Sequence, residues 1–318
     1  MKKDRKLRSE RLILLPLFSA AFICFAATGH ASAPKTYDLC PIFFRCLENS
    51  PLDKQERARL FAQSVIQPYP EIYHRPEIFN TNPAALEKYL DEVRPYLPAI
   101  RKIHGRFVDQ FATIEEAFYA HFPDFDRSRV KVYLMLSLFR FDGKIPHDDP
   151  RALFLALDGL AKFHGANVRL EVILSHELFH LYHFQVNPLP ATIDEIPLYR
   201  QIWQEGLATY VSRSLNSNAS LADVLLDPQL ARDGPKYLAM ASCNLLTQLE
   251  STDDETTARY LSYRRGGKNP SRMGYLIGYN IVAKMAATRS LRDLARLRGQ
   301  RLLHLMRREV RALTTLLP

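Results

Sequence analysis

The spacing of hydrophobic residues along the chain predicts a mainly helical protein. In five stretches apolar positions recur every three or four residues, as they do on one face of a helix. These stretches are residues 51–66, 84–122, 236–249, 273–287 and 291–317. Pro68 and Pro70 should end the first helix, and Pro95 and Pro98 should break or kink the second.

Residues 168–185, VRLEVILSHELFHLYHFQ, are apolar on nearly every side of a helix. Neither glycine nor proline interrupts them. A helix that lacks a continuous polar face is normally buried in its domain. We therefore expect this helix to lie in the core, where its neighbours hold its few polar side chains rigidly.

Two segments ahead of the buried helix have the composition of β-strands. Residues 130–141 (VKVYLMLSLFRF) and 152–158 (ALFLALD) are rich in β-branched, aromatic and other bulky apolar residues. The segment between them contains Asp142-Gly143 and Pro146 to Pro150, which are typical of turns. We expect an α+β fold that is mainly α-helical, with a small β-sheet packed on the buried helix.

The buried helix carries a pattern that is typical of metal sites. His176, Glu177 and His180 form H-E-x-x-H. Residues four apart lie on the same helix face, so both imidazoles can reach one ion. Glu177 then lies beside a metal-bound water, where a general base is needed. The alternative is a helix with two hydrogen-bonded core histidines and no metal.

A third ligand for such an ion is available downstream. Residues 202–212, IWQEGLATYVS, form a second helical stretch that contains Glu205. Two histidines and one glutamate are a known catalytic zinc set that leaves a fourth position for water. Gly206 and Ala208 are small enough to let this helix pack closely against the first. The residues therefore predict one zinc ion per chain, on His176, His180 and Glu205.

H-E-L-F-H followed by E-G-L-A-T-Y resembles the gluzincin clan of zinc metallopeptidases, and within it a group of bacterial predicted Zn-dependent proteases of unknown specificity. The resemblance covers roughly residues 130–286. It implies a zincin-like domain with His176, His180 and Glu205 as zinc ligands and Glu177 as catalytic base. Many gluzincins carry an aspartate four residues after the ligand glutamate, where this chain has Thr209. The partner that orients the zinc histidines therefore stays open.

The resemblance also implies where a substrate would bind. Related metallopeptidases use an edge strand of the small sheet to pair with the substrate backbone. The alternative is a hairpin that only covers the helix. The resembling proteins have a Gly- and Tyr-containing helix facing the metal, which corresponds here to residues 273–287. A tyrosine hydroxyl there stabilises the oxyanion, and Tyr279 is preferred over Tyr275, with burial for packing as the alternative for each.

His183 follows His180 by three residues on the same helix face. As a fourth ligand it would make a closed structural site. Two helical turns separate it from His176, which is too far for both to share an ion with His180. We expect His183 to line the cleft or to cap the helix end.

The first residues have the organisation of a signal peptide. Residues 1–11 are basic, residues 12–27 are apolar but short for a membrane span, and Ala31-Ser32-Ala33 fits a cleavage site. We expect residues 1–33 to be removed and the protein to be periplasmic or secreted. An uncleaved N-terminal anchor is the alternative.

Charge and cysteine content refine this picture. The net charge of +9 falls to about +5 without residues 1–33, because six Lys/Arg and two acids leave. No nucleic-acid motif is present, so we expect no nucleic-acid partner. Export permits a Cys40–Cys46 disulfide, which we expect together with a buried free thiol at Cys243. Zinc ligation by Cys40 and Cys46 lacks the second pair that it would need.

The chain is thus expected to comprise the signal peptide 1–33, a helical region 34–125, a zincin-like core 126–290 and a basic C-terminal helix 291–318. That helix should dock through its apolar stripe, with weak contact to a membrane surface or cell-wall polymer as the alternative. The predicted function is an exported zinc metallopeptidase acting on peptides or proteins. The alternatives are a non-catalytic zinc-containing envelope-binding protein and an envelope-binding module that acts through the basic helix.

Overall fold

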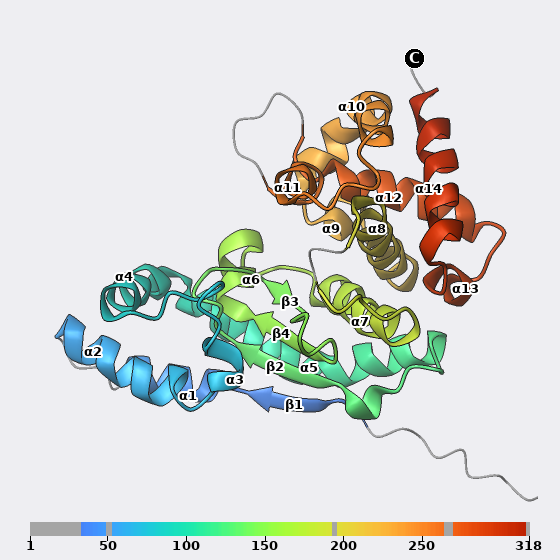
Figure 1. Cartoon of the computed structure of the whole chain (residues 1–318). Helices are drawn as coiled ribbons and strands as arrows, with labels where there is room; N and C mark the ends of the chain where they lie inside the picture. The colour runs from blue at the N-terminus through green and yellow to red at the C-terminus, as the bar shows by residue number, and fades with distance from the viewer. Residues whose placement is uncertain (1–32, 49–52, 193–195, 264–269, 316–318) are drawn as a thin grey trace, which may run out of the picture. The chain divides into compact units, whose positions relative to one another are not determined.

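A computed structural model describes residues 33–48, 53–192, 196–263 and 270–315 (Figure 1). The predicted signal peptide, except for Ala33, lies outside these residues. The fold is mainly helical with one four-stranded sheet, which confirms the expected α+β class. No helix within the described ranges is both long and apolar enough to cross a membrane.

The sheet has the strand order β1-β2-β4-β3. Its strands are β1 (Lys35–Asp38), β2 (Lys131–Met135), β3 (Gly143–Lys144) and β4 (Ala152–Ala156). The first three strands of this order are parallel, and the short β3 pairs antiparallel with β4 at the opposite edge. The two predicted strands are therefore parallel neighbours rather than the two arms of a hairpin.

A buried carboxylate explains why the first predicted strand ends at Met135 rather than continuing to residue 141. Leu138 and Phe139 have positive φ angles of 54° and 61°, which no strand contains. Asp158, fully buried, accepts hydrogen bonds from the backbone nitrogens of Ser137 (2.7 Å) and Phe139 (2.8 Å). Asp158 thus fixes the turn that leads the chain into β3.

The N-terminal region is helical, as expected. It contains α1 (Cys40–Glu48), α2 (Lys54–Phe61), a π-helical turn (Ala62–Ile66), α3 (Pro70–Tyr73), α4 (Pro83–Val93) and α5 (Leu97–His121). The predicted break falls between α4 and α5, where a 3-10 turn contains Pro95 and Pro98 lies at the start of α5. Helix α5 packs against the helix that carries H-E-x-x-H.

The expected Cys40–Cys46 disulfide and the expected burial of Cys243 are both wrong. Cys40 and Cys46 are free thiols six residues apart on α1, so they lie on different faces of the helix. Cys243 is also free, but it is exposed rather than buried.

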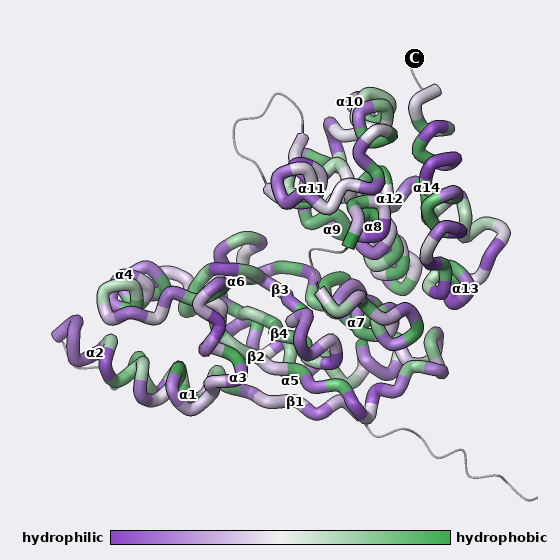
Figure 2. The backbone as a smooth tube through the Cα atoms, viewed as in Figure 1, coloured by the Kyte–Doolittle hydropathy of each residue, from purple (hydrophilic) through white to green (hydrophobic). Residues whose placement is uncertain are grey.

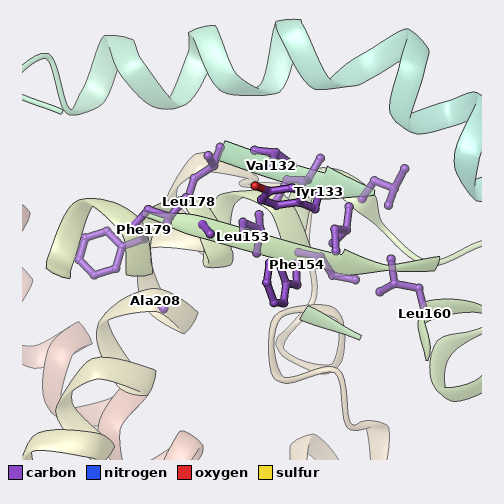
Figure 3. Close-up of a cluster of buried hydrophobic side chains, with 14 of the residues drawn as sticks. Val132, Tyr133, Leu153, Phe154, Leu160, Leu178, Phe179 and Ala208 are labelled. Carbon is purple, nitrogen blue, oxygen red and sulfur yellow. The ribbon is translucent and has the colours of Figure 1, made fainter. Parts of the chain in front are cut away.

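The helix with H-E-x-x-H is α7 (Leu170–Val186), and it follows α6 (Leu157–His164). As predicted, α7 is buried along most of its length. It packs against β4 on one side and against α8 (Leu198–Leu215) on another. Figure 3 shows the core at this junction, where Leu178 and Phe179 of α7 lie near Leu153 of β4 and Ala208 of α8.

The C-terminal part consists of helices, most of which contact α8. They are α9 (Leu221–Leu225), α10 (Pro228–Leu246), α11 (Asp254–Leu261), α12 (Met273–Ala286), α13 (Leu291–Ala295) and α14 (Gly299–Thr314). The single basic helix expected at the C-terminus is thus two helices. Figure 2 shows hydrophobic and hydrophilic residues mixed along α14, whose apolar side packs mainly against α10.

The close helix contact at Gly206 differs from the one expected. A Cβ atom on Gly206 would lie 2.4 Å from the carbonyl carbon of Gly278, and one on Gly278 would lie 2.4 Å from the carbonyl oxygen of Ile202. These glycines let the backbones of α8 and α12 touch. Gly206 therefore brings α8 against α12 rather than against α7.

Candidate metal centre

Two helices bring His176, His180 and Glu205 together, as their sequence pattern predicts. The Nε2 atoms of His176 and His180, one turn apart on α7, are 3.0 Å from each other. Oε2 of Glu205, on α8, lies 3.3 Å from His176 Nε2 and 3.5 Å from His180 Nε2. Three potential ligand atoms therefore converge on one point between α7 and α8.

These separations fit a tetrahedral zinc ion. Two zinc–ligand bonds of about 2.0–2.1 Å that meet at a tetrahedral angle hold their ligand atoms about 3.3 Å apart. Oε2 of Glu205 is buried and has no hydrogen-bond donor in the described part of the chain. A buried carboxylate oxygen without a donor is costly unless a cation satisfies it. The geometry and the donor set both suit a divalent metal.

The protonation states of His176 and Glu205 also suit metal binding. Burial lowers the pKa of His176, which keeps its imidazole neutral. Burial opposes ionisation of Glu205, but the two histidines outweigh it and hold its pKa well below the usual range. Burial likewise lowers the pKa of His180, but the charge of Glu205 outweighs burial and raises it. A metal ion would displace a proton from this pair when it binds.

Glu177 lies beside the convergence point, against the edge strand β3. A Cβ atom on Gly143 would be 2.6 Å from Oε1 of Glu177, so only glycine allows the strand to come this close. Burial raises the pKa of Glu177 to about 7, and the charges of Asp142 and Glu205 act in the same direction. A carboxyl group with a pKa near neutrality is well suited to take and return a proton.

A cavity of about 260 Å³ opens onto this group of residues. It is lined by His176, Glu177, His180 and Glu205, by residues of β3, and by Arg272 and Tyr275 at the start of α12. Val172, Ile173, Phe184, Val224 and Leu226 give it apolar walls. Metal-type ligands, a titratable carboxyl group and a mixed polar and apolar lining thus share one cavity, as in many enzyme sites.

The two candidate tyrosines occupy different places. Tyr275 lines the cavity, and burial, together with the nearby charge of Glu205, raises its pKa, so its hydroxyl stays protonated. Tyr279 lies one turn further along α12, outside the cavity lining. Its hydroxyl accepts a hydrogen bond from Arg213 at 2.6 Å. The preference for Tyr279 over Tyr275 is therefore not supported by the arrangement.

His183 does not line the cavity, so the first of its two expected roles is wrong. It lies near the helix end, where its Nε2 is 3.4 Å from Nδ2 of the C-cap residue Asn187. Its side chain is fully buried and stacks on Phe179, with ring centroids 5.7 Å apart. Burial lowers its pKa to about 3, with smaller contributions from His180 and Arg200. His183 is a neutral core residue about one turn beyond His180, towards the C-terminal end of α7.

The acceptor for a zinc histidine, which the sequence left open, is not Thr209. Nδ1 of His180 and Oγ1 of Thr209 are both buried, and neither has a hydrogen-bond partner among the described residues. Gly143, Arg272 and the Asp142–His164 pair (2.6 Å) are site features that the sequence did not identify. The sequence marked Asp142-Gly143 only as a turn, and Arg272 had no periodic or spacing signal.

Comparison with known proteins agrees with this chemistry. Residues 150–297 match the model of a family described as predicted Zn-dependent protease (DUF2268). No curated protein and no solved structure matches the chain. The matched segment contains His176, Glu177, His180 and Glu205 and begins after β3. This similarity supports a zinc-dependent protease.

Proposed function

We propose that the protein is a zinc-dependent metallopeptidase of the gluzincin type, which binds one zinc ion per chain and hydrolyses peptide bonds. The observation that carries the proposal is the convergence of three ligand atoms, 3.0–3.5 Å apart, beside the carboxyl group of Glu177. A structural zinc site would need a fourth protein ligand and no adjacent base. The family match supports a zinc-dependent protease.

His176, His180 and Glu205 would hold the zinc ion. Bound zinc would polarise the scissile carbonyl and lower the pKa of a water molecule toward neutrality. Glu177 would take a proton from the attacking water and pass it to the leaving amine. The protonated hydroxyl of Tyr275 would donate a hydrogen bond to the negative charge that develops on the carbonyl oxygen.

The substrate backbone would lie along β3. Among the described strands it is at the edge of the sheet and pairs only with β4, and it contributes Gly143 and Lys144 to the cavity lining. An extended peptide added to such an edge gains main-chain hydrogen bonds. The contact between Gly143 and Glu177 would bring that peptide next to the catalytic carboxyl group.

The proposal is tested by peptide hydrolysis with Glu177→Gln. The variant should lose activity by about 100-fold or more, because an amide cannot accept the proton, while its zinc content stays at the wild-type level. Glu171→Gln is the matched control, since Glu171 also lies on α7 but pairs with Arg169 outside the cavity. Full activity in Glu177→Gln would show that Glu177 is not the base.

We propose further that the protein is exported, on the basis of residues 1–33. Cell fractionation of the full chain and of a chain without residues 2–33 tests this. The alternative, a non-catalytic zinc-containing envelope-binding protein, predicts bound zinc with no cleavage of any member of a peptide library.

A further inference from the structure

Arg272 is a buried cation in the cavity that no step of the proposed hydrolysis uses. Its side chain lines the cavity although the residue is only 8% exposed. Nη1 donates hydrogen bonds to the carbonyl oxygen of Leu225 and to the hydroxyl of Tyr263, both at 2.8 Å. The guanidinium also lies 3.9 Å from the ring centroid of Tyr275. All of these partners are electrically neutral.

Arg272 makes no ion pair with any acid in the described part of the chain. Buried charges in proteins normally have an oppositely charged partner, because burial of an unpaired charge is costly. Three carboxyl groups share the cavity with Arg272, and one of them, Glu177, makes no ion pair with it. Glu205 would be committed to the metal, and Asp142 is paired with His164 at 2.6 Å. The positive charge of Arg272 is thus left for a group that enters the cavity.

The guanidinium is placed so that it can receive such a group. The hydrogen bonds from Arg272 to Leu225 and Tyr263 both leave from Nη1, so they do not use Nε and Nη2. A planar guanidinium binds a carboxylate through two parallel N–H groups. Arg272 also has a φ of 58°, a left-handed conformation that is rare outside glycine and often found at functional sites.

The same cavity contains a second cation and apolar walls. Lys144 of β3 lines it and makes no ion pair within the described ranges. Val172, Val224 and Leu226 supply apolar surface in the same cavity. The lining therefore suits a carboxylate together with an aliphatic or aromatic side chain, which is the combination found at the C-terminal residue of an apolar peptide.

We propose that Arg272 forms a carboxylate-binding subsite, so that the enzyme prefers peptides that bring a carboxylate to the metal centre. The C-terminal carboxylate of an apolar residue is the expected source, and an acidic side chain is the other. This inference rests on the proposed function. It names the substrate class as peptides cleaved close to a free C-terminus.

Three acetylated peptides of equal length test the subsite. They differ only at the last residue, which is leucine with a free carboxylate, leucine amide or glutamate amide. The wild type should cleave the acid at least about 10-fold more efficiently than leucine amide, as expected for a charge-assisted hydrogen bond. Arg272→Gln should lose this preference because it cleaves the acid peptide more slowly, while its cleavage of the leucine amide is unchanged. Arg272→Lys should retain part of the preference.

Arg213→Gln is the matched control, because Arg213 also contacts a tyrosine but lies outside the cavity lining. It should keep the wild-type ratio of acid to amide cleavage. Efficient cleavage of the glutamate amide, dependent on Arg272, would support the subsite with a side chain as the source of the carboxylate. Equal cleavage of acid and amide by the wild type would overturn the subsite. An equal loss for both peptides in Arg272→Gln would also overturn it, because that result indicates an oxyanion or structural role.

Measurements of peptide affinity show whether the subsite or the proposed peptidase function has failed. Affinities of the acid and amide peptides are measured by calorimetry on zinc-loaded Glu177→Gln, with and without Arg272→Gln. If the wild type cleaves no peptide but the acid still binds more tightly through Arg272, the peptidase proposal fails and the subsite stands. If cleavage occurs without discrimination, the subsite alone fails. Zinc content and thermal midpoint establish that each variant is folded.

Discussion

Two groups of potential metal ligands occur in the described residues, and they differ in how their atoms are already used. His176, His180 and Glu205 form one, and Asp38, Cys40 and His104 form the other. In each group the ligand atoms lie within 4.8 Å of one another. Proximity of suitable side chains therefore does not distinguish a metal site from an ordinary polar cluster.

In the Asp38 group both carboxylate oxygens and one histidine nitrogen already have partners. Oδ1 of Asp38 accepts a hydrogen bond from the backbone nitrogen of Cys40 at the start of α1, and Oδ2 lies 2.7 Å from Nε2 of His104. Burial raises the pKa of Cys40 well above its usual value, and the charge of Asp38 adds to this effect. The thiol therefore stays protonated, whereas metal ligation needs a thiolate.

The metal centre shows the opposite pattern. Oε2 of Glu205 and Nδ1 of His180 are buried without hydrogen-bond partners in the described chain. The cavity beside them carries Glu177 and Arg272, neither of which has a salt-bridge partner among the described residues. Unsatisfied buried groups are rare in stable folds and call for a ligand. The two clusters therefore differ in that the metal centre combines partnerless ligand atoms with a cavity that contains a titratable carboxyl group.

Replacing a glycine by alanine should affect activity at the metal centre (Gly143) but not beside the Asp38 group (Gly105). Gly143→Ala puts a Cβ atom 2.6 Å from Oε1 of Glu177 and should displace the base from its working position. We expect a loss of about 10- to 100-fold in kcat with zinc content unchanged, since small misplacements of catalytic groups have effects of this size. Steady-state kinetics and metal analysis measure both quantities.

Gly105→Ala is the matched control beside His104. A Cβ atom on Gly105 would meet nothing within 4 Å, and alanine favours the helix in which it lies. Its kcat should stay at the wild-type value. A Gly143→Ala variant with normal kcat would show that the contact between β3 and Glu177 is not needed for catalysis.

The two clusters should also differ in how they make the free energy of unfolding depend on pH, although this effect is smaller than the effect on kcat. The pKa of Glu177 is raised from 4.5 to about 7, so the folded metal-free protein binds more protons than the unfolded chain between these values. Glu177 therefore contributes a fall in the free energy of unfolding as pH rises from about 5 to 8. Glu177→Gln should remove about 1–3 kcal/mol of this fall, as judged from denaturant unfolding at both pH values.

Cys40→Ser provides the comparison from the other cluster. Because the pKa of the Cys40 thiol is raised, it stays neutral from pH 5 to 8 in both folded and unfolded chains. The variant should change the free energy of unfolding equally at both pH values, so that its dependence on pH stays as in the wild type. A Glu177→Gln variant with the wild-type slope would contradict the raised pKa of Glu177.

The sequence predicted the parts of the site that depend on local spacing. His176, Glu177 and His180 lie on one helix, so helical geometry alone brings the two imidazoles together. Glu205 was identified because a two-histidine set needs a further ligand. The buried character of α7 followed from its composition, since no face of the helix is polar.

The sequence did not reveal features that arise from long-range contacts. The parallel pairing of β1, β2 and β4 depends on chain crossovers that no local pattern specifies. The approach of Gly143 to Glu177 and the placement of Arg272 in the cavity result from the packing of distant elements. His183 had helical spacing similar to that of the ligands, but it faces the core because α7 is covered on that side by other residues.

The central claim is that the metal is held by His176, His180 and Glu205 and not by the Asp38 group. Metal analysis by mass spectrometry on purified wild type, Glu205→Ala and His104→Ala tests it most directly. We expect about one zinc per chain in the wild type and in His104→Ala, and little or none in Glu205→Ala. Zinc that persists in Glu205→Ala but is lost from His104→Ala, or a wild type that takes up no zinc, would contradict the account.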